Sequence, residues 1–300
     1  MKSLQVNDMD ENLVKTLERI AASLEKVAEN QAQRSLTTPA PMPQSSSNCF
    51  VFDATENSLL PIERLACPDL SLLKGIDRAR ETLFANTKRF AEGFNANNAL
   101  LWGARGMGKS TLVKSIFKDL VNSGNSDLKL VEIHREDIIR LPSLLNMIKS
   151  AEGYYIVFCD DLSFNRPDRD FKALKSVLEG GLEGRPENVI FYATSNRRHL
   201  LPRAMMDQES ATGINPNEAM DEVIALSDRF GLWLGFHPCD QAEYLSMIDG
   251  YFGAFNIQAD QSEWEAEALE WSKTRGSRSG RTAWQFFNDY AGKKSLKISF

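Results

Sequence analysis

Short apolar runs with the length and composition of buried strands recur along the middle of the chain. They cover residues 99–102, 127–133, 154–159, 189–193 and the last part of 224–236. Between them, apolar residues recur at helical spacing, in a stretch that ends near Phe94, in residues 112–120, 136–149 and 171–179. Pro142 is expected to break the helix over residues 136–149. Strands that alternate with helices predict an α/β fold with a parallel sheet sandwiched by helices.

From residue 240 onward the pattern is helical throughout. Three groups of apolar and aromatic side chains recur at helical spacing: Tyr244, Leu245 and Ile248; Trp264, Ala268 and Trp271; Trp284, Phe286 and Phe287. The three tryptophans and two phenylalanines among them are expected to form the core of a small helical domain, in preference to platforms for stacking bases. We therefore predict an α/β domain over residues 49–238 and an all-helical lid domain over residues 239–300.

The N-terminal part has a different pattern. Residues 10–28 are predicted to form an amphipathic helix within an N-terminal unit of residues 1–30, with Asp10 as its N-cap. Its apolar stripe consists of Leu13, Leu17, Ile20, Leu24 and Val27. Such a short helix is marginal alone, so either it packs on an unidentified protein partner or another subunit, or it is a loosely tethered tail. Residues 31–48 are rich in Pro and Ser and are expected to form a flexible linker.

Composition narrows the function classes. The chain has 300 residues and a net charge of −6, which argues against strong general affinity for nucleic acid but leaves a local basic patch open. No apolar run is long enough to span a bilayer and the N-terminus lacks a signal-peptide core, so we expect a cytoplasmic protein without a membrane partner. The four cysteines form no C-x-x-C pair, so a metal cluster or disulfide framework is not expected.

Residues 103–110 read G-A-R-G-M-G-K-S and match the G-x-x-x-x-G-K-[ST] phosphate loop. The loop follows a predicted strand and precedes a predicted helix, where backbone N–H groups and the helix dipole favour a bound phosphate. Lys109 is predicted to reach the β- and γ-phosphates, and the Ser110 hydroxyl to bind Mg²⁺. The predicted ATP-binding residues are Gly103, Ala104, Arg105, Gly106, Met107, Gly108, Lys109, Ser110 and Thr111.

Two adjacent carboxylates follow the strand over residues 154–159. Asp160 is predicted to hold Mg²⁺ beside the phosphate loop, and Asp161 to act as the base that polarises the attacking water. The alternative is that both are exposed aspartates that cap the next turn. We favour the metal and water site because the phosphate loop is also present.

The order of these motifs resembles that of the AAA+ ATPases. After the phosphate loop come V-F-C-D-D, A-T-S-N, S-D-R-F-G and a helical tail with G-S-R-S-G-R-T-A. This order is similar to Walker A, Walker B, sensor 1, an arginine-finger motif and sensor 2. The resemblance extends from about Leu65 to the C-terminus. Longer segments, among them C-D-D-L-S-F and L-S-D-R-F-G-L-W-L, are similar to those of a bacterial AAA+ family without an assigned cellular role. It implies a P-loop NTPase fold with a helical lid.

The resemblance also implies roles for single residues. Asn196 would be sensor 1, unless it only holds a tight turn. Arg229 would be a finger that reaches the neighbouring subunit's site, unless it forms a surface ion pair with Asp228 or another carboxylate. Arg281 would be sensor 2, although Arg278 lies on nearly the same face of a helix. The segment L-L-K-G-I-D resembles the strip that lies against the adenine in AAA+ proteins.

Two departures from the family pattern affect the expected function. Asp161 stands where many AAA+ proteins have Glu, and the shorter side chain predicts slow turnover. The segment after the second strand, H-R-E-D-I-I-R-L-P-S, has no aromatic residue, so threading of a polypeptide is not supported. The leading hypothesis is an oligomeric ATPase that remodels or loads a partner macromolecule. The alternatives are a slowly hydrolysing switch or loader on DNA and, less favoured, a P-loop kinase.

Overall fold

The computed structural model describes residues 15–23, 25–26, 47–164, 169–180, 185–198, 200, 226 and 229–298. The chain divides into two compact units, Met1–Pro41 and Met42–Phe300. In the first unit, residues 15–23 and 25–26 are helical, and the Leu17 and Ile20 side chains are exposed. The remainder of the helix predicted for residues 10–28 and nearly all of the predicted linker lie outside the described residues. The same holds for residues 203–217, whose polar and irregular sequence predicts a loop or insertion.

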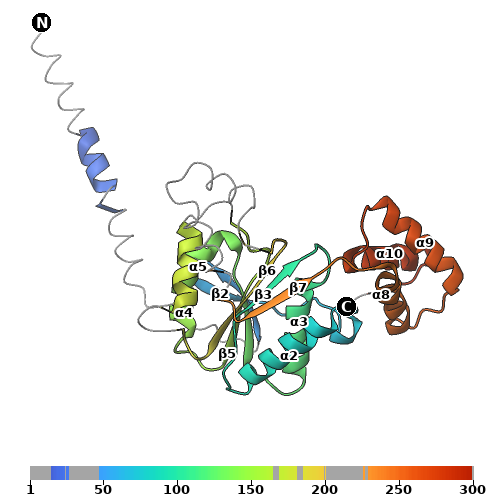
Figure 1. Cartoon of the computed structure of the whole chain (residues 1–300). Helices are drawn as coiled ribbons and strands as arrows, with labels where there is room; N and C mark the ends of the chain where they lie inside the picture. Colours follow the sequence, from blue (N-terminus) through green and yellow to red (C-terminus); the bar gives the residue numbers. More distant parts are fainter. Residues whose placement is uncertain are drawn as a thin grey trace, which may run out of the picture. The chain divides into compact units, whose positions relative to one another are not determined.

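A seven-stranded sheet forms the centre of the second unit, and its strands lie in the order β2-β1-β4-β5-β6-β3-β7 (Figure 1). The strands are β1 (Cys49–Asp53), β2 (Ser58–Pro61), β3 (Ala99–Gly103), β4 (Leu128–Glu132), β5 (Tyr154–Cys159), β6 (Val189–Ser195) and β7 (Leu232–Phe236). All neighbouring pairs are parallel except β1 and β2. The predicted α/β fold is confirmed, with one antiparallel edge strand that the sequence pattern did not indicate.

Helices cover both faces of this sheet (Figure 1). The helices α2 (Asp77–Ala91) and α3 (Lys109–Asn122) share a hydrophobic cluster with Ile156 and Phe158 of β5. The 3₁₀ helix η2 (Arg135–Arg140), α4 (Leu141–Ile148) and α5 (Arg169–Glu179) share the opposite cluster with Tyr155 and Val157. Alternate residues of β5 thus point to opposite faces, and both are buried, as expected for a central parallel strand.

The helical stretch over residues 136–149 is interrupted next to Pro142, as the sequence analysis expected. Residues 135–140 form η2, and Pro142 lies in the first turn of α4. A proline is tolerated there because the first N–H groups of a helix have no partner within it. Pro142 therefore helps to start a helix at the point where a break was predicted.

The C-terminal part is helical, as predicted, and consists of α8 (Gln241–Ala254), α9 (Gln261–Thr274) and α10 (Gly280–Lys293). Each begins at a side-chain cap, provided by Asp240, Asp260 and Ser279 respectively. Aromatic side chains pack between the helices: the Phe252 ring contacts the rings of Trp264, Phe287 and Tyr290. The short helix η1 (Leu70–Leu72) contacts both α3 and α8. None of the described helices is long and apolar enough to cross a membrane.

Candidate nucleotide-binding site

The predicted phosphate loop connects the carboxyl end of β3 to the first residue of α3. Gly103, Gly106 and Gly108 all have positive φ angles, of 123°, 74° and 83°. A Cβ on Gly103 would overlap the backbone of Phe236 in β7, so no larger residue fits there. The glycines therefore set both the turn and its close contact with the neighbouring strand.

The Lys109 side chain folds back onto the phosphate loop that precedes it in the chain. Its ammonium donates hydrogen bonds to the carbonyls of Gly103 and Ala104, at 3.0 and 2.8 Å, and to Asn196 Oδ1 at 3.1 Å. Only 7% of the residue is exposed. Burial lowers the pKa of Lys109, while the carboxylates of Asp160 and Asp161 oppose this shift. The structure thus holds a desolvated cation where the sequence predicted a phosphate-binding lysine.

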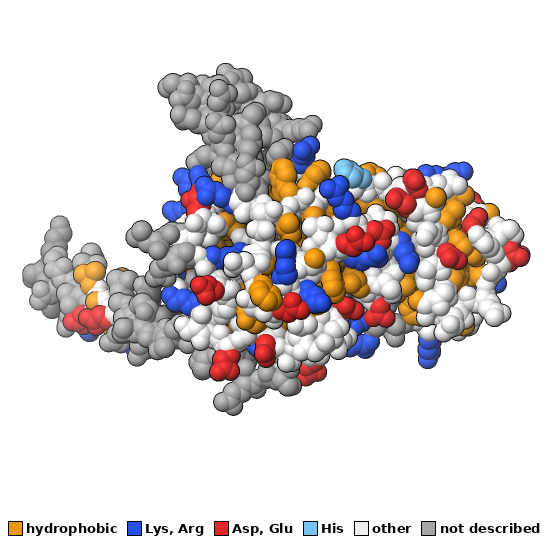
Figure 2. Space-filling model, turned by 60° about the horizontal axis from the view of Figure 1, so that its bottom comes forward, with side chains coloured by type: hydrophobic (Ala, Val, Ile, Leu, Met, Phe, Trp, Pro, Cys, Tyr) orange, Lys and Arg blue, Asp and Glu red, His pale blue; other side chains and the backbone are white. Residues whose placement is uncertain are grey.

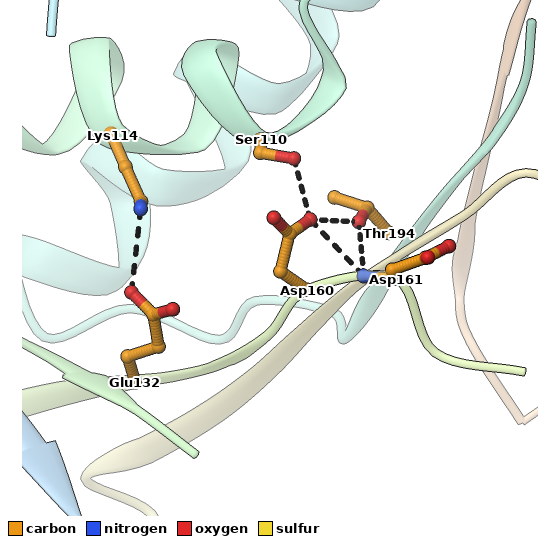
Figure 3. A network of polar contacts seen from close by, with 6 residues as sticks. All are labelled: Ser110, Lys114, Glu132, Asp160, Asp161 and Thr194. Carbon is orange, nitrogen blue, oxygen red and sulfur yellow. Dashed lines mark hydrogen bonds and ion pairs between the residues drawn. The ribbon is translucent and has the colours of Figure 1, made fainter. Parts of the chain in front are cut away.

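Ser110 and Asp160 meet beside the loop, as Figure 3 shows. The Ser110 hydroxyl donates to Asp160 Oδ1 at 2.5 Å, and the Thr194 hydroxyl donates to the same oxygen. The backbone N–H of Asp161 donates to Thr194 Oγ1 at 2.9 Å. One carboxylate oxygen is therefore held by hydroxyls from α3 and β6. Thr194 was not among the residues predicted from the sequence, although its place in A-T-S-N, at the end of a predicted strand, marks it as a candidate.

The Asp161 carboxylate points away from the contact between Ser110 and Asp160 (Figure 3). Asp161 has a φ of 50°, in the left-handed region that Asp and Asn tolerate better than most residues. Its Oδ1 accepts a hydrogen bond of 2.6 Å from Asn196 Nδ2. Because Asn196 also accepts from Lys109, its amide connects the Asp161 carboxylate to the Lys109 ammonium.

These groups open onto a cavity of about 710 Å³, a size typical of small-molecule sites. Its polar end is lined by Arg105, Lys109, Ser110, Asp160, Asp161, Thr194 and Asn196. Its other walls include Leu72, Leu73 and Ile76 from the L-L-K-G-I-D strip, and Met247, Tyr251 and Trp284 from the lid. The resemblance to AAA+ proteins implies that this strip lies against the adenine. The sequence gave no local signal for the three lid residues, which are distant in the chain.

Arg281 and Arg278 take different positions. Arg281 lines the cavity, and its backbone N–H donates to the Gly106 carbonyl at 3.0 Å. Arg278 instead points toward the start of α8, where its guanidinium donates to Gln241 Oε1 at 3.4 Å. Of the two residues that the sequence left open for the sensor 2 position, Arg281 is the one at the cavity.

Arg229 lies away from the lining of its own chain's cavity. Its guanidinium forms an ion pair of 2.9 Å with Glu179 at the end of α5, and 43% of its side chain is exposed. The partner considered in the sequence analysis, Asp228, is outside the described residues. Arg229 therefore presents a partly exposed cation apart from the phosphate loop that precedes it in the chain.

The oxygen ligands at this site suit a magnesium ion. The Ser110 hydroxyl and the Asp160 carboxylate are hard oxygen donors that lie in hydrogen-bonding contact with each other, and Mg²⁺ prefers such groups. Among the described residues, no group of three or more His, Cys, Asp and Glu side chains converges on a point that could hold a metal. The four cysteines are free and buried, and burial raises the pKa of Cys49 to about 11.

Three arginines that could belong to a local basic patch for nucleic acid, Arg197, Arg198 and Arg275, have local protein contacts. Arg197 donates to the Phe164 carbonyl at 3.4 Å, and the Arg198 guanidinium lies over the ring of Trp102. Arg275 lies over Trp271. On the face shown in Figure 2, Lys and Arg side chains are interspersed with Asp and Glu side chains. The face in that view thus has no continuous basic stripe.

Comparisons with known structures agree with this arrangement. Two mutants of RuvB from Thermotoga maritima are similar with TM-scores of 0.51 at 14% and 16% identity; the matches cover 78% and 79% of this chain and 68% and 70% of RuvB. ORC2 from Aeropyrum pernix, solved in ADPNP–ADP complexes, is similar with a TM-score of 0.50 at 12% identity, covering 80% of this chain and 68% of ORC2. At these identities the likeness shows the fold alone, which is that of the AAA+ proteins.

No curated protein sequence matches the chain. The profile of a family described as "Protein of unknown function (DUF815)" matches residues 45–294, which include the whole sheet and all three lid helices. The match covers most of the chain, and the protein therefore belongs to the DUF815 family.

Proposed function

We propose that the protein binds Mg-ATP in this cavity and hydrolyses it. The observation that carries the proposal is the chain of contacts from Lys109 through Asn196 to Asp161, beside the Ser110–Asp160 contact. A desolvated cation, a pair of hard oxygen ligands and a separate carboxylate are the parts that phosphoryl transfer from ATP to water requires. Similarity to ORC2, which was solved with ADPNP and ADP, supports the same ligand class.

In this proposal each side chain has one task. Lys109 binds the terminal phosphates, and Ser110 and Asp160 hold Mg²⁺, which neutralises phosphate charge when bound. Asn196 orients Asp161, which accepts a proton from the attacking water. At the same time the water oxygen forms a bond to the γ-phosphorus, and the bond between the γ-phosphorus and the β-phosphate oxygen breaks. Arg281 contacts the phosphates from the lid.

We further propose that residues 49–238 form the nucleotide-binding domain, that residues 239–300 form its lid, and that a second copy of the chain completes the site. Arg229 supports the shared site because it is partly exposed and lies apart from its own cavity. A guanidinium contributed by a neighbouring chain would offset the charge that develops on the transferred phosphoryl group. Assembly and hydrolysis are thus linked in the proposal.

The work done by the ATPase is proposed to be remodelling or loading of a partner macromolecule. The N-terminal segment is the proposed partner-binding element, since Leu17 and Ile20 are exposed on its described helical part. A slowly hydrolysing switch that acts on DNA is the second candidate. It is favoured by the short Asp161 side chain, which predicts slow turnover.

The test of the central proposal is Mg-ATP binding by Lys109→Ala. We expect this variant to lose tight binding and to keep its circular dichroism spectrum, because Lys109 contributes charge to the cavity. Lys88→Ala, which removes an exposed lysine from α2, is the matched control and should bind normally. Unchanged affinity in a folded Lys109→Ala protein would refute the site. ATPase rates with and without single-stranded DNA, together with mass by light scattering, separate the two candidate functions.

A further inference from the structure

Arg105 is the third residue of the phosphate loop. The contacts of the residue before it in the chain indicate which end of the cavity Arg105 lines. The carbonyl of Ala104, the residue before it, accepts a hydrogen bond from the Lys109 ammonium. Asn196 accepts from the same ammonium. Arg105 also lines the cavity. It therefore belongs to the polar end of the cavity, where the terminal phosphates are proposed to bind, and not to the apolar walls.

No carboxylate in the described part of the chain forms an ion pair with the Arg105 guanidinium. The residue is exposed, and none of the ion pairs or side-chain hydrogen bonds found in the described part of the chain involves it. The two nearby carboxylates have other partners: Asp160 accepts from Ser110, and Asp161 accepts from Asn196. A guanidinium is always charged and presents donors in a planar fork that matches a phosphate group. Phosphate is thus the chemical class of ligand that suits this side chain.

The charge balance at this end of the cavity also favours a highly charged ligand. Three cationic side chains, Lys109, Arg281 and Arg105, lie with two carboxylates, Asp160 and Asp161. Burial is the main cause of the lowered pKa of Lys109, and the charges of Arg281 and Arg105 lower it further. The field of Arg105 therefore reaches the ammonium of Lys109. A terminal γ-phosphate would bring additional negative charge to this group of cations, which a diphosphate lacks.

We infer that Arg105 binds the terminal phosphate of a nucleoside triphosphate from within the same chain, so that the site prefers the triphosphate to the diphosphate. This inference rests on the proposed nucleotide site and assigns a specific role there to Arg105, which the sequence analysis names only as one of the ATP-binding residues. Arg105 acts in cis because it belongs to the loop that it serves. Arg229, by contrast, is proposed to act on a neighbouring copy. The two guanidinium groups can therefore be distinguished by experiment.

The first experiment compares the affinities for Mg-ATPγS and Mg-ADP, measured by calorimetry at one ionic strength. Arg105→Ala should weaken ATPγS binding about tenfold or more and ADP binding less than about threefold, since a charged hydrogen bond to one phosphate is lost. Arg105→Lys keeps the charge but not the fork and should fall between Arg105→Ala and the wild type. Arg78→Ala removes an exposed arginine of α2 outside the cavity and should bind both nucleotides normally.

The outcomes of this experiment distinguish failure of the inference from failure of the proposed function. Equal losses for the two nucleotides, or no loss in a folded variant, would overturn the inference and leave the proposed function standing. A wild-type protein that binds neither nucleotide would defeat the proposed function and the inference with it. A second experiment mixes Arg105→Ala with Lys109→Ala protein and measures ATPase activity. No rescue is expected, because both residues belong to one phosphate loop, and activity above the sum of the two variants would overturn the assignment in cis.

Discussion

The backbone N–H of Arg281 donates a hydrogen bond of 3.0 Å to the carbonyl of Gly106, which joins the first turn of α10 to the phosphate loop. The acceptor, Gly106, is a glycine, and the donor, Arg281, follows Gly280 in the chain. A Cβ on Gly280 would lie 3.2 Å from the Gly106 carbonyl oxygen, and one on Gly106 would meet the Ser279 hydroxyl oxygen at 2.9 Å. The lid and the loop thus approach more closely than larger residues would allow, so movement of one is coupled to the other.

The first prediction tests this contact with Gly280→Ala. The added Cβ would crowd the Gly106 carbonyl and move the start of α10 away from the loop. We expect ATP affinity to fall about threefold to tenfold, which corresponds to weakening one hydrogen bond. Titration of the variant with Mg-ATP measures the loss.

Gly292→Ala is the matched control in the same helix. Apart from its chain neighbours and the backbone of its own helix, nothing lies within 4 Å of a Cβ at Gly292, and alanine favours a helix over glycine by about 0.5–1 kcal/mol. This variant should be slightly more stable and bind ATP normally. If Gly280→Ala also binds normally, the contact between lid and loop contributes nothing to the nucleotide-bound state.

The second prediction concerns pH and Lys109. Burial lowers its pKa below the ordinary value of 10.5, and only the protonated amine binds phosphate as a cation. ATP affinity should therefore fall as the pH rises through this lowered pKa, at a lower pH than an exposed lysine would require. Calorimetry in two buffers of different ionisation enthalpy should show proton uptake on ATP binding in that range.

The stability of the nucleotide-free protein should change in the opposite direction. An unfolded chain binds the Lys109 proton more tightly than the folded chain does, so the cost of the buried charge is present at low pH and is relieved as the pH rises. Urea unfolding of wild type and Lys109→Met from pH 7 up to the ordinary lysine pKa of 10.5 tests this, because contributions of the buried cysteines cancel in the difference. A difference that does not vary with pH would show that Lys109 titrates as an ordinary lysine.

The third prediction separates binding from hydrolysis. Asp161→Asn should keep ATP affinity and lose activity by about a hundredfold or more, since it removes the proposed base and keeps the acceptor for Asn196. Asparagine also tolerates the φ of 50° at this position, so the fold should be unchanged. Steady-state kcat and the dissociation constant for ATP are the two measurements. Full activity would place the base elsewhere.

Asp161→Glu tests whether the short side chain limits turnover. A glutamate at this positive φ should cost about 1 kcal/mol of stability, so we expect a lower melting temperature than that of Asp161→Asn. Its kcat should exceed that of Asp161→Asn, because a carboxylate is retained. A kcat above the wild-type value would show that the distance from the Asp161 carboxylate to the water limits the reaction.

The positive φ angle of Asp161 is a feature of the site that could not be predicted from the sequence. Strand ends and glycine turns have local signals, so the phosphate loop, Asp160 and Asn196 could be placed from the sequence at the carboxyl edge of a sheet. The left-handed backbone at Asp161 and the short approach of Arg281 to Gly106 depend on tertiary packing, which periodicity does not encode. Likewise, β1 and β2 pair antiparallel with no helix between them, so the alternation of strands and helices does not mark them as part of the sheet.

The last prediction tests whether two chains share one site. Arg229 is ion-paired with Glu179 near the surface, and an exposed pair contributes about 1 kcal/mol or less to stability, so Arg229→Ala should fold. This variant should bind ATP and hydrolyse it poorly, and mixing it with Lys109→Ala protein should restore activity. Some interfaces would then combine an intact phosphate loop on one chain with an intact Arg229 from its neighbour.

A monomeric enzyme cannot show this rescue, because each chain lacks one required charge. The mixture must be concentrated enough to assemble, and wild-type specific activity should rise with concentration over the same range. The control mixture contains Arg89→Ala and Lys109→Ala chains. Arg89 is an exposed residue of α2 that does not line the cavity. Because Arg89→Ala chains keep both the phosphate loop and Arg229, their sites should have wild-type activity in the mixture. If the Arg229→Ala and Lys109→Ala chains exchange subunits without regaining activity, Arg229 serves the Glu179 ion pair and not a neighbouring site.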